Sequence, residues 1–456
     1  MVVDKLNTTK KPPLEIVLQN SWNCISPKTK FHTIHGDEVI VLFSGIWNFE
    51  EGPDFKSAKI SIGNNILTGD IEIHRYPDDW ISHGHHNDER YVDVILHVVG
   101  APAKSDLFKN DKMPDVPTVV LPNKFIQIPV PGKTEIYPYG YCASKFSKFS
   151  DETLHTFFED AGIKRFLEKV SIITPEILKG GVETSFLKFF FDSCGYKKNR
   201  QEFIELFNRF IEYDIDSFSI KEAVAVIWGE SGLLPDQVSP DLSAEMKVFV
   251  EGIWLNWWKI REGTRDKINW HLSGVRPLNN PYRRIAAISV FISKFGTKPF
   301  AKLLEEFNEV TDISCAWKKF KELLVCRDDL WDHYSEPSHT LSKSAAVLGE
   351  ARGLDIMVNV LLPFIYAYSE IHFLDEIKEK ALFSWKCLPA CQSNIVLKVC
   401  AHRWLIPHER ARLVFNSSAS QQGAMFIYKR FCEAGQMNCT KCPIYSLITQ
   451  VSAFKS

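Results

Sequence analysis

The sequence has little net charge and no long apolar run, and both absences narrow the class of protein. Of its 456 residues, 54 are Lys or Arg and 56 are Asp or Glu, so the formal net charge is -2. A chain so balanced does not attract nucleic acid by bulk charge, and any such contact must be local. The most apolar stretch, residues 353–368, contains Asp355 and Asn359 and is shorter than the ~20 residues that cross a bilayer. We therefore expect no membrane-spanning segment.

Several targeting signals and catalytic motifs are also missing. The first residues include lysines but no apolar stretch followed by a cleavage site, so we expect a cytoplasmic protein without a secretory signal. The sequence has no phosphate-binding loop, dinucleotide-binding glycine turn, Gly-x-Ser-x-Gly elbow or His-Glu-x2-His helix. Nucleotide hydrolases, dinucleotide oxidoreductases and the common hydrolase families are therefore disfavoured. In such a chain the 11 cysteines predict reduced thiols, some of them metal ligands.

What is present is an ordinary globular composition with two patterns along the chain. Apolar residues make up 45% and charged residues 24%, enough for a sizeable core. Short β-branched runs separated by Gly, Pro and Asn fill residues 38–136, and helical spacing begins near Ser150. We expect an α+β fold with a core in residues 1–100, a Pro-rich β extension and linker in 101–145, and an α-helical domain in 146–456.

The segment from Pro12 to Gly100 carries most of the candidate chemistry. A helix can begin at Pro12-Pro13 and would carry Glu15. Strands are expected at residues 38–43, 58–62, 66–74 and 92–99. In the third of these, the period of two places Asp70, Glu72 and His74 on one face, opposite an apolar face. That polar face is either a reactive surface or solvent-exposed.

A second helix is expected after Pro77, although Gly84 would weaken it. On this helix Trp80, His83, Asn87 and Tyr91 share one stripe. Histidines at 83, 85 and 86 could form a metal cluster with His74, but solvated loop histidines explain them nearly as well.

This order of elements, with Pro53-Asp54 opening one strand and Glu72-Ile73-His74 ending the next, resembles the core of the restriction-endonuclease-like PD-(D/E)xK nuclease superfamily. The resemblance implies that Asp54 and Glu72 hold Mg²⁺ or Mn²⁺, which polarises the phosphate and lowers the pKa of bound water. The superfamily has Lys where this chain has His74, which would position or deprotonate the water. Glu15 matches an additional acid of some members, and Asn87-x3-Tyr91 resembles the Gln-x3-Tyr pair of the RecB-like branch.

The resemblance implies a divalent-metal-dependent nuclease whose partner is nucleic acid. Its catalytic residues would be Asp54, Glu72, His74 and Glu15, supported by Asp70, His83, Asn87 and Tyr91. The missing lysine leaves two alternatives open. One is a catalytically inactive nuclease-fold protein that binds nucleic acid or acts as a scaffold. The other is a metal hydrolase of another substrate that uses the histidines.

A second resemblance extends over nearly the whole chain. The segments GPDFKSAKI, TGDIEIHRYPDDW, RPLNNPYRRIA, LLPFIYAY and ASQQGAMFIYKRFC are similar to those of an uncharacterised bacterial family known as a domain of unknown function. This resemblance implies a cytosolic protein and names no reaction.

The C-terminal cysteines form another candidate site. Cys432, Cys439 and Cys442 offer three thiolates within eleven residues. Cys400 is the first choice for a fourth ligand, and His402, Cys387 and Cys391 are alternatives. Four such ligands suit Zn²⁺ or an iron–sulfur cluster, whereas buried cysteines can also pack simply as small apolar residues.

Two basic segments remain. One contains Arg276, Arg283 and Arg284, and the other contains Arg403, Arg410 and Arg412. Arginines beside aromatic residues or histidines can follow a phosphate backbone, but a solvated helix face explains them more simply.

Overall fold

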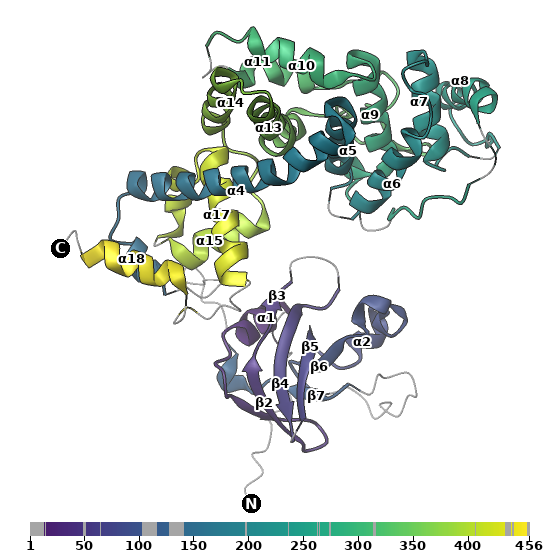
Figure 1. Ribbon diagram of the computed structural model, residues 1–456. Helices are drawn as coiled ribbons and strands as arrows, with labels where there is room; N and C mark the ends of the chain where they lie inside the picture. Colours follow the sequence, from purple (N-terminus) through teal and green to yellow (C-terminus); the bar gives the residue numbers. More distant parts are fainter. Residues whose placement is uncertain are drawn as a thin grey trace, which may run out of the picture. The chain divides into compact units, whose positions relative to one another are not determined.

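A computed structural model of the chain describes residues 13–453, apart from residues 14, 49–51, 64, 103–115, 127–140, 197, 236, 262, 264, 273–274, 313–315, 406, 434–438 and 440–441 (Figure 1). An N-terminal sheet is followed by a largely helical region, so the expected α+β class is confirmed. By its contacts the chain divides into two compact units. The first contains residues 1–154, 393–414 and 424–456, and the second contains residues 155–392 and 415–423.

The first unit is built on a mixed seven-stranded sheet. Its strands are β1 (Lys30–His32), β2 (Glu38–Phe43), β3 (Ile46–Trp47), β4 (Phe55–Ile62), β5 (Asn65–His74), β6 (Val94–Val99) and β7 (Thr118–Val120). The order is β1-β2-β4-β5-β6-β7, with β3 paired to β4. Strands β1, β2, β4 and β5 are antiparallel neighbours, whereas β5, β6 and β7 run parallel. The expected strands are therefore confirmed, with β7 inside the Pro-rich extension.

Helix α1 (Glu15–Asn23) packs against β5 and begins where the two prolines predict (Figure 1). Its side chains Leu18 and Trp22 are fully buried, and the helix contacts β5 of the sheet. In β5 the burial pattern is alternating only at the start, because Asp70 to His74 are all buried. The polar face of this strand is therefore enclosed, which places Glu72 and His74 inside the protein.

The register of β5 changes beside Gly69. The pairing of β5 with β6 shifts between Asp70 and Ile71. A Cβ atom at Gly69 would lie 2.5 Å from the carbonyl oxygen of Asp93 and from the Ile95 side chain. Only glycine permits β6 to approach this closely, and the approach sets Glu72 opposite His97.

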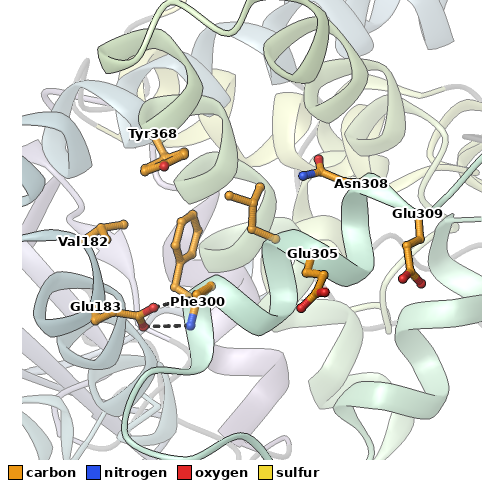
Figure 2. Close-up of a pocket in the computed structure, with 9 residues that line it drawn as sticks. Val182, Glu183, Phe300, Glu305, Asn308, Glu309 and Tyr368 are labelled. Carbon is orange, nitrogen blue, oxygen red and sulfur yellow. Dashed lines mark hydrogen bonds between the residues drawn. The ribbon is translucent and has the colours of Figure 1, made fainter. Parts of the chain in front are cut away.

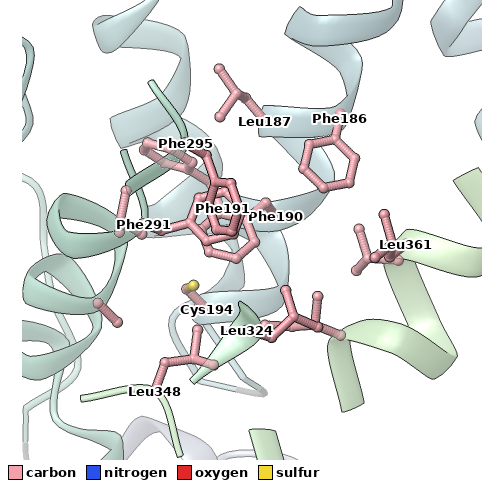
Figure 3. Close-up of a cluster of buried hydrophobic side chains, with 14 of the residues drawn as sticks. Phe186, Leu187, Phe190, Phe191, Cys194, Phe291, Phe295, Leu324, Leu348 and Leu361 are labelled. Carbon is pink, nitrogen blue, oxygen red and sulfur yellow. The ribbon is translucent and has the colours of Figure 1, made fainter. Parts of the chain in front are cut away.

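The second unit is helical apart from a two-stranded ribbon, β8 (Tyr334–Glu336) and β9 (His339–Thr340). Its helices are α4 (Asp151–Gly180), which starts in the first unit, α5 (Val182–Cys194), α6 (Arg200–Phe210), α7 (Ile220–Glu230), α8 (Ala244–Ile260), α9 (Pro281–Phe295), α10 (Pro299–Asn308), α11 (Ala316–Leu324), α12 (Glu350–Ile356), α13 (Leu362–Ile371), α14 (Asp375–Lys386) and α17 (Ser418–Ile427), which ends in the first unit. Figure 3 shows part of its core, where Phe190 stacks on Phe291 with ring centroids 4.0 Å apart.

The C-terminal part of the first unit adds α15 (Ile395–Trp404), α16 (Ala411–Val414) and α18 (Pro443–Ala453). Both α15 and α18 contact the short helix α3 (Ala143–Phe146). Arg410, between α15 and α16, pairs with Asp151 at 2.5 Å and donates to the Phe149 carbonyl at 2.7 Å. These contacts join residues far apart in the sequence.

The apolar stretch near residue 360 is longer than expected but belongs to the core. A continuous helical segment runs over Glu350–Ile371, with a π-helical turn at Met357–Leu361 between α12 and α13. It is long and apolar enough to cross a membrane, yet 67% of its most apolar window is buried inside the protein. Such burial is typical of a core helix.

Three of the six arginines in the two basic segments lie inside the protein. Arg283 is fully buried and donates to the carbonyl oxygens of Trp331, Tyr334, Ala345 and Ala346. Arg284 and Arg403 are also buried. Neither a phosphate-binding surface nor a solvated face fits these three side chains. Arg283 and Arg284 lie inside because their guanidinium groups donate to carbonyl oxygens of residues 331–347.

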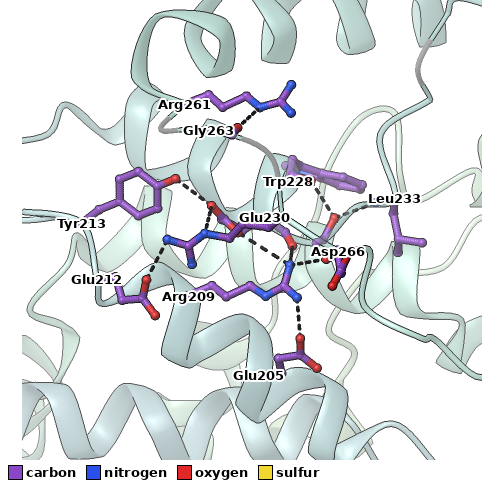
Figure 4. A network of polar contacts seen from close by, with 12 residues as sticks. Glu205, Arg209, Glu212, Tyr213, Trp228, Glu230, Leu233, Arg261, Gly263 and Asp266 are labelled. Carbon is purple, nitrogen blue, oxygen red and sulfur yellow. Dashed lines mark hydrogen bonds and ion pairs between the residues drawn. The ribbon is translucent and has the colours of Figure 1, made fainter.

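A buried carboxylate in the second unit has a similar structural role. Glu230, at the end of α7, accepts a hydrogen bond from the Tyr213 hydroxyl at 2.6 Å (Figure 4). The guanidinium groups of Arg209 and Arg265 each lie 3.8 Å from its oxygens. The network links α6, α7 and the loop after α8.

Candidate active site in the sheet

Asp54 and Glu72 are held together by reciprocal backbone hydrogen bonds. The Asp54 N–H donates to Glu72 Oε2 at 3.0 Å, and the Ile73 N–H donates to Asp54 Oδ2 at 2.9 Å. The pairing of Phe55 with Ile71 in antiparallel β4 and β5 brings the two acids to the same end of the sheet. Asp54 and Glu72 are therefore in direct contact although they are 18 positions apart in the sequence.

Helix α1 adds two side chains to this pair. Gln19 Nε2 donates to the second oxygen of Asp54, Oδ1, at 2.7 Å. Glu15 lies one helical turn earlier and is half-buried, and its charge acts on both Asp54 and Glu72. The helix therefore both anchors the first carboxylate and brings a third one to the site.

The pKa values of all three carboxyl groups are raised. Burial, followed by the charges of Glu72 and Glu15, raises the pKa of Asp54 well above its ordinary value. Burial and the charge of Glu15 raise the pKa of Glu72 to about 8. Burial is also the main cause that raises the pKa of Glu15. The charge of Lys56 lowers the pKa of Glu72 only in part, and a cation bound among the acids would supply further positive charge.

Two histidines lie next to the second oxygen of Glu72, and two further histidines contact one of them, His74. His74 Nε2 and His85 Nε2 each lie 3.3 Å from Glu72 Oε1. His74 Nε2 is 3.2 Å from His83 Nδ1, and His74 Nδ1 is 2.9 Å from His97 Nε2. Among the described residues, one group of three His, Cys, Asp or Glu side chains has all its ligand atoms within 4.8 Å, namely His74, His83 and His85.

Burial keeps the inner histidines neutral. It lowers the pKa of His74 to about 2, with the charges of His97, His85 and His83 adding to the effect. It lowers the pKa of His97 to about 3. Neutral imidazole is the form that ligates metals. Because His83 is exposed and His85 is half-buried, the group opens to solvent on their side.

Asp70 is engaged elsewhere. Its Oδ2 lies 2.6 Å from Lys56 Nζ, and its Oδ1 accepts a hydrogen bond from the Ser57 N–H at 3.1 Å. Ser57 has a positive φ of 55°, so Asp70 stabilises an irregular point in β4. Its carboxylate therefore holds Lys56, whose charge lowers the pKa of Glu72.

The expected second helix is wrong in its length. One turn, α2 (Asp79–Ser82), is followed by two 3-10 turns at His85–Asn87 and Glu89–Tyr91. The break occurs at Gly84, which has φ 76°. Asn87 is exposed and contacts His86, so a shared stripe does not form.

The same break still brings Tyr91 to the histidines. Its ring stacks on His85, with the centroids 3.8 Å apart. The pKa of Tyr91 is raised by burial and by the charges of Glu72, Asp88 and Asp54.

Three residues of the site were not among the sequence candidates. Gln19 follows Glu15 by one helical turn, a spacing that indicates a shared face. His97 lies opposite Glu72 in the parallel pair of β5 and β6, a register that no sequence spacing predicts. Lys56 lies only two positions after Asp54, but its bond to Asp70 depends on the irregular β4 backbone.

The C-terminal cysteines lie in the same unit but in another part of the sequence. Cys432 lies in the π-helical turn Tyr428–Glu433, and Cys442 directly precedes α18. The Cys442 N–H donates to the Cys439 carbonyl at 3.3 Å. Cys400 on α15 is fully buried, with its sulfur 3.8 Å from the Ala424 carbonyl oxygen. All ten described cysteines are free thiols.

Comparison with protein families finds one family that matches the chain. Residues 15–394, more than half of the chain, match the family described as Protein of unknown function (DUF2851). The chain belongs to this family. No curated protein and no solved structure matches it. The matched span includes Glu15, Asp54, Glu72 and the histidines, and it ends before Cys400 and the last three cysteines.

The helical unit also contains cavities, and one of them is lined by residues other than these acids. It measures about 550 Å³ and lies between α5, α10 and α13 (Figure 2). Its Glu183 accepts hydrogen bonds from the Phe300 and Ala301 N–H groups, both at 2.8 Å. Glu183 therefore caps the start of α10, which is a structural role.

Proposed function

We propose that the protein is a divalent-metal-dependent nuclease that hydrolyses phosphodiester bonds of DNA or RNA in the cytoplasm. The observation that carries the proposal is that Asp54 and Glu72 are tied by reciprocal hydrogen bonds at one end of the sheet, where the charge of Glu15 acts on both. A group of carboxylates with raised pKa values is what a hard divalent cation neutralises, and Mg²⁺ is usually held by one or two carboxylates with phosphate oxygens.

The topology supports the same proposal. Helix α1 is followed by the antiparallel neighbours β2, β4 and β5, then by short helical turns, and then by β6 parallel to β5. This is the order of the nuclease core that the sequence resembles. The resemblance already used the order of elements, and the pairing directions of the strands are the additional observation, because they are not encoded in the spacing of Asp54 and Glu72.

Each side chain has a distinct role in this proposal. Asp54 and Glu72 hold the cation, with Glu15 as an additional ligand directly or through water. The cation polarises the phosphate and lowers the pKa of the attacking water. His74, buried and neutral between Glu72 and His97, orients the Glu72 carboxylate. Because the buried His74 is neutral, it does not balance the negative charge that develops on the phosphate in the transition state.

Lys56 supplies the positive charge that position 74 lacks. Its Nζ lies 2.6 Å from Asp70, its side chain is 41% exposed, and its charge reaches Glu72. It is thus both held in place and accessible to a phosphate. A lysine on β4 would take over the role that the superfamily gives to the lysine after the second acid.

The test is cleavage of single- and double-stranded DNA and RNA by the purified chain with Mg²⁺ or Mn²⁺. Asp54→Asn and Glu72→Gln should each lower the rate roughly 100-fold or more, because metal charge stabilisation amounts to several kcal/mol and ~1.4 kcal/mol changes a rate tenfold. Lys56→Gln should lower the rate while metal binding persists, measured by the thermal shift that Mn²⁺ produces.

Glu38→Gln is the matched control, since Glu38 is an exposed carboxylate on β2 that pairs with Lys30 at 3.0 Å. It should leave cleavage unchanged. If folded wild-type protein binds Mn²⁺ but cleaves no substrate, the binding or scaffold alternative replaces the nuclease. Equal activity of wild type and Asp54→Asn would reject the site itself.

The histidine group favours a second candidate, a transition-metal-dependent hydrolase of another substrate. His74, His83 and His85 are close enough to hold one ion beside Glu72, and imidazole suits Zn²⁺ or Mn²⁺ better than Mg²⁺. His85→Asn separates the candidates. It should abolish activity and tight Zn²⁺ binding in the second, and it should leave Mg²⁺-dependent cleavage largely intact in the first.

A further inference from the structure

A second cavity in the helical unit is lined by an excess of basic side chains. It measures about 440 Å³ and is bounded by α4, α5, α12 and the π-helical turn that follows α12. This volume is within the ~300–1,000 Å³ that small-molecule sites occupy. Its lining residues all belong to the second unit. They include two acidic and four basic side chains, namely Asp192, Asp355, Arg165, Lys169, Arg200 and Arg352.

Two of the four basic side chains are paired with the two acids. The Arg200 Nε donates to Asp192 Oδ1 at 2.7 Å, and a second Arg200 nitrogen contacts the other oxygen of the same carboxylate. Arg352 pairs with Asp355 at 3.2 Å. The charge excess of the cavity therefore comes from the two remaining cations, which both lie on α4.

These two cations, Arg165 and Lys169, lie one helical turn apart and have no carboxylate partner. Neither forms an ion pair within the part of the chain that the structure describes, and the buried Nε of Arg165 has no hydrogen-bond partner there. The Lys169 ammonium can donate three hydrogen bonds. It donates to two neutral oxygens, Asn359 Oδ1 at 2.5 Å and Gln422 Oε1 at 3.2 Å. Donors of both side chains thus remain for a ligand.

The two neighbouring charges also act against each other. Burial, followed by the charge of Arg165, lowers the pKa of Lys169 to about 7, and the charge of Asp355 offsets this in part. Burial lowers the pKa of Arg165 as well, and Glu168 offsets that change in part. An anion bound between the two cations would stabilise the charged form of both.

The irregular helix opposite α4 supplies an independent observation. Asn359 lies in the π-helical turn Met357–Leu361. Its Nδ2 donates to the Asp355 carbonyl at 2.8 Å, and its Oδ1 accepts from Lys169. Turns of this kind are rare in helices and occur frequently at functional sites. The turn therefore marks the same cavity as the two cations do.

The lining indicates the class of ligand. A phosphate monoester carries about two negative charges at neutral pH, which matches two unpaired cations. A guanidinium binds phosphate oxygens through a planar fork of donors, and an ammonium acts on them as a point charge. An organic group attached to the phosphate would be covered by the apolar part of the lining, which contains Ile172, Ile173, Phe189, Ile356 and Val360.

We propose that this cavity binds a small organic phosphate monoester, with its phosphate between Arg165 and Lys169 and its organic part on the apolar side chains. Arg200 and Arg352, held by their acidic partners, complete the basic lining. The site consists of residues of the helical unit. The proposal therefore goes beyond the nuclease and does not depend on the carboxylates of the sheet.

Isothermal titration calorimetry of the full-length chain with phenyl phosphate tests the proposal. A metal chelator is present, so that the carboxylates of the sheet cannot bind the probe through a cation. Phenyl phosphate should bind roughly tenfold or more tightly than benzoate or inorganic phosphate, because benzoate has one charge and inorganic phosphate has no apolar part. Phenol should not bind. Absence of phenyl phosphate binding, or equal affinity for benzoate, overturns the proposal.

Substitutions locate the site. Arg165→Gln and Lys169→Gln should each weaken phenyl phosphate binding by about tenfold or more, because each removes a charge-assisted contact. Lys164→Gln is the matched control, since Lys164 is an exposed cation on the same helix that does not line the cavity. It should bind like wild type. Wild-type affinity in Arg165→Gln would overturn the assignment.

Thermal unfolding separates ligand binding from a structural role of Arg165. Its Nε makes no hydrogen bond, and its charge lowers the pKa of Lys169, so Arg165→Gln should keep or raise the Tm of the ligand-free protein. Phenyl phosphate should raise the Tm of wild type and of Lys164→Gln but not that of Arg165→Gln. A lower Tm of ligand-free Arg165→Gln with an undiminished response to phenyl phosphate would assign Arg165 to the structure and overturn the proposal.

Discussion

Glu72 lies at the end of β5, where it accepts a hydrogen bond from the Asp54 backbone and lies 3.3 Å from two histidines. Its side chain is 6% exposed, and its pKa is raised to about 8 by burial and by Glu15. In the folded protein it therefore keeps a proton at a pH at which the unfolded chain has released it. The folded state loses stability relative to the unfolded state as the pH rises toward that value.

Replacement of this carboxylate should stabilise the metal-free protein in a pH-dependent manner. Between pH 6.5 and about 8, the inner histidines are neutral in both states while Glu72 ionises in the folded state. The Tm of Glu72→Gln should rise relative to wild type across this interval and level off above it, by roughly 2–4 °C for each kcal/mol gained. Thermal unfolding in the presence of a metal chelator measures the effect.

The same measurement has an internal check. Saturating Mn²⁺ should reverse the order at pH 8, because the cation stabilises wild type and not the variant. Glu38→Gln, at an exposed ion pair, should track wild type at every pH. A Tm difference for Glu72→Gln that does not change with pH would mean that the carboxylate is not buried in its protonated form.

Helices α4 and α17 approach each other through glycine. A Cβ atom at Gly423 would lie 1.7 Å from the Phe158 carbonyl oxygen, and one at Gly162 would lie 2.2 Å from the Ala419 carbonyl oxygen. The two backbones are therefore in direct contact, and a methyl group cannot enter without separating the helices.

Gly423→Ala should destabilise the protein by ~1–3 kcal/mol or more, because the added methyl group overpacks a contact between rigid helices. Gly252→Ala on α8 is the matched control, since a Cβ atom placed there would meet no atom within 4 Å. It should stabilise α8 by roughly 0.5–1 kcal/mol through helix propensity. Denaturant unfolding measures the change in the free energy of unfolding for each variant. Equal changes in the two variants would contradict the close contact of α4 and α17.

At the scale of the whole molecule, each compact unit is built from segments that are not consecutive in the chain. Residues 393–414 and 424–456 are grouped with the N-terminal sheet, while residues 415–423 belong to the helical unit. Phe158 of the helical unit contacts Phe415, with ring centroids 5.1 Å apart. The C-terminal segment thus contributes to the cores of both units.

A chain that ends at Gln392 should therefore fail to form either unit properly. It loses the ion pair of Arg410 with Asp151 and exposes Phe158, which is otherwise fully buried. Burial of each large apolar side chain contributes ~1.5–3 kcal/mol, so loss of several approaches the whole stability of a domain. Insolubility or a broad, early thermal transition is expected, whereas a chain that ends at Ala453 should unfold like wild type. A sharp transition at the wild-type Tm in the shorter chain would refute this dependence.

Local patterns predicted the parts of the fold that depend on neighbouring residues. The bounds of β2 and the start of α1 follow from β-branched runs and paired prolines. The period of two in a strand also placed Glu72 on one face with Asp70 and His74, whereas Asp54 was singled out by the resemblance to the nuclease core. The burial of Arg283 and Arg284 was not predicted, because the carbonyl groups that Arg283 satisfies come from residues 331–346.

The sequence by itself determined the class of fold, the main strands of the sheet and a set of candidate residues, since these depend on composition and on spacing within one element. Only the tertiary structure decided which of them meet. The register of β5 with β6 brings His97 to His74, and the irregular β4 backbone brings Lys56 to Asp70. Each meeting joins residues from different elements, whose relative placement is set by packing and strand pairing rather than by local spacing.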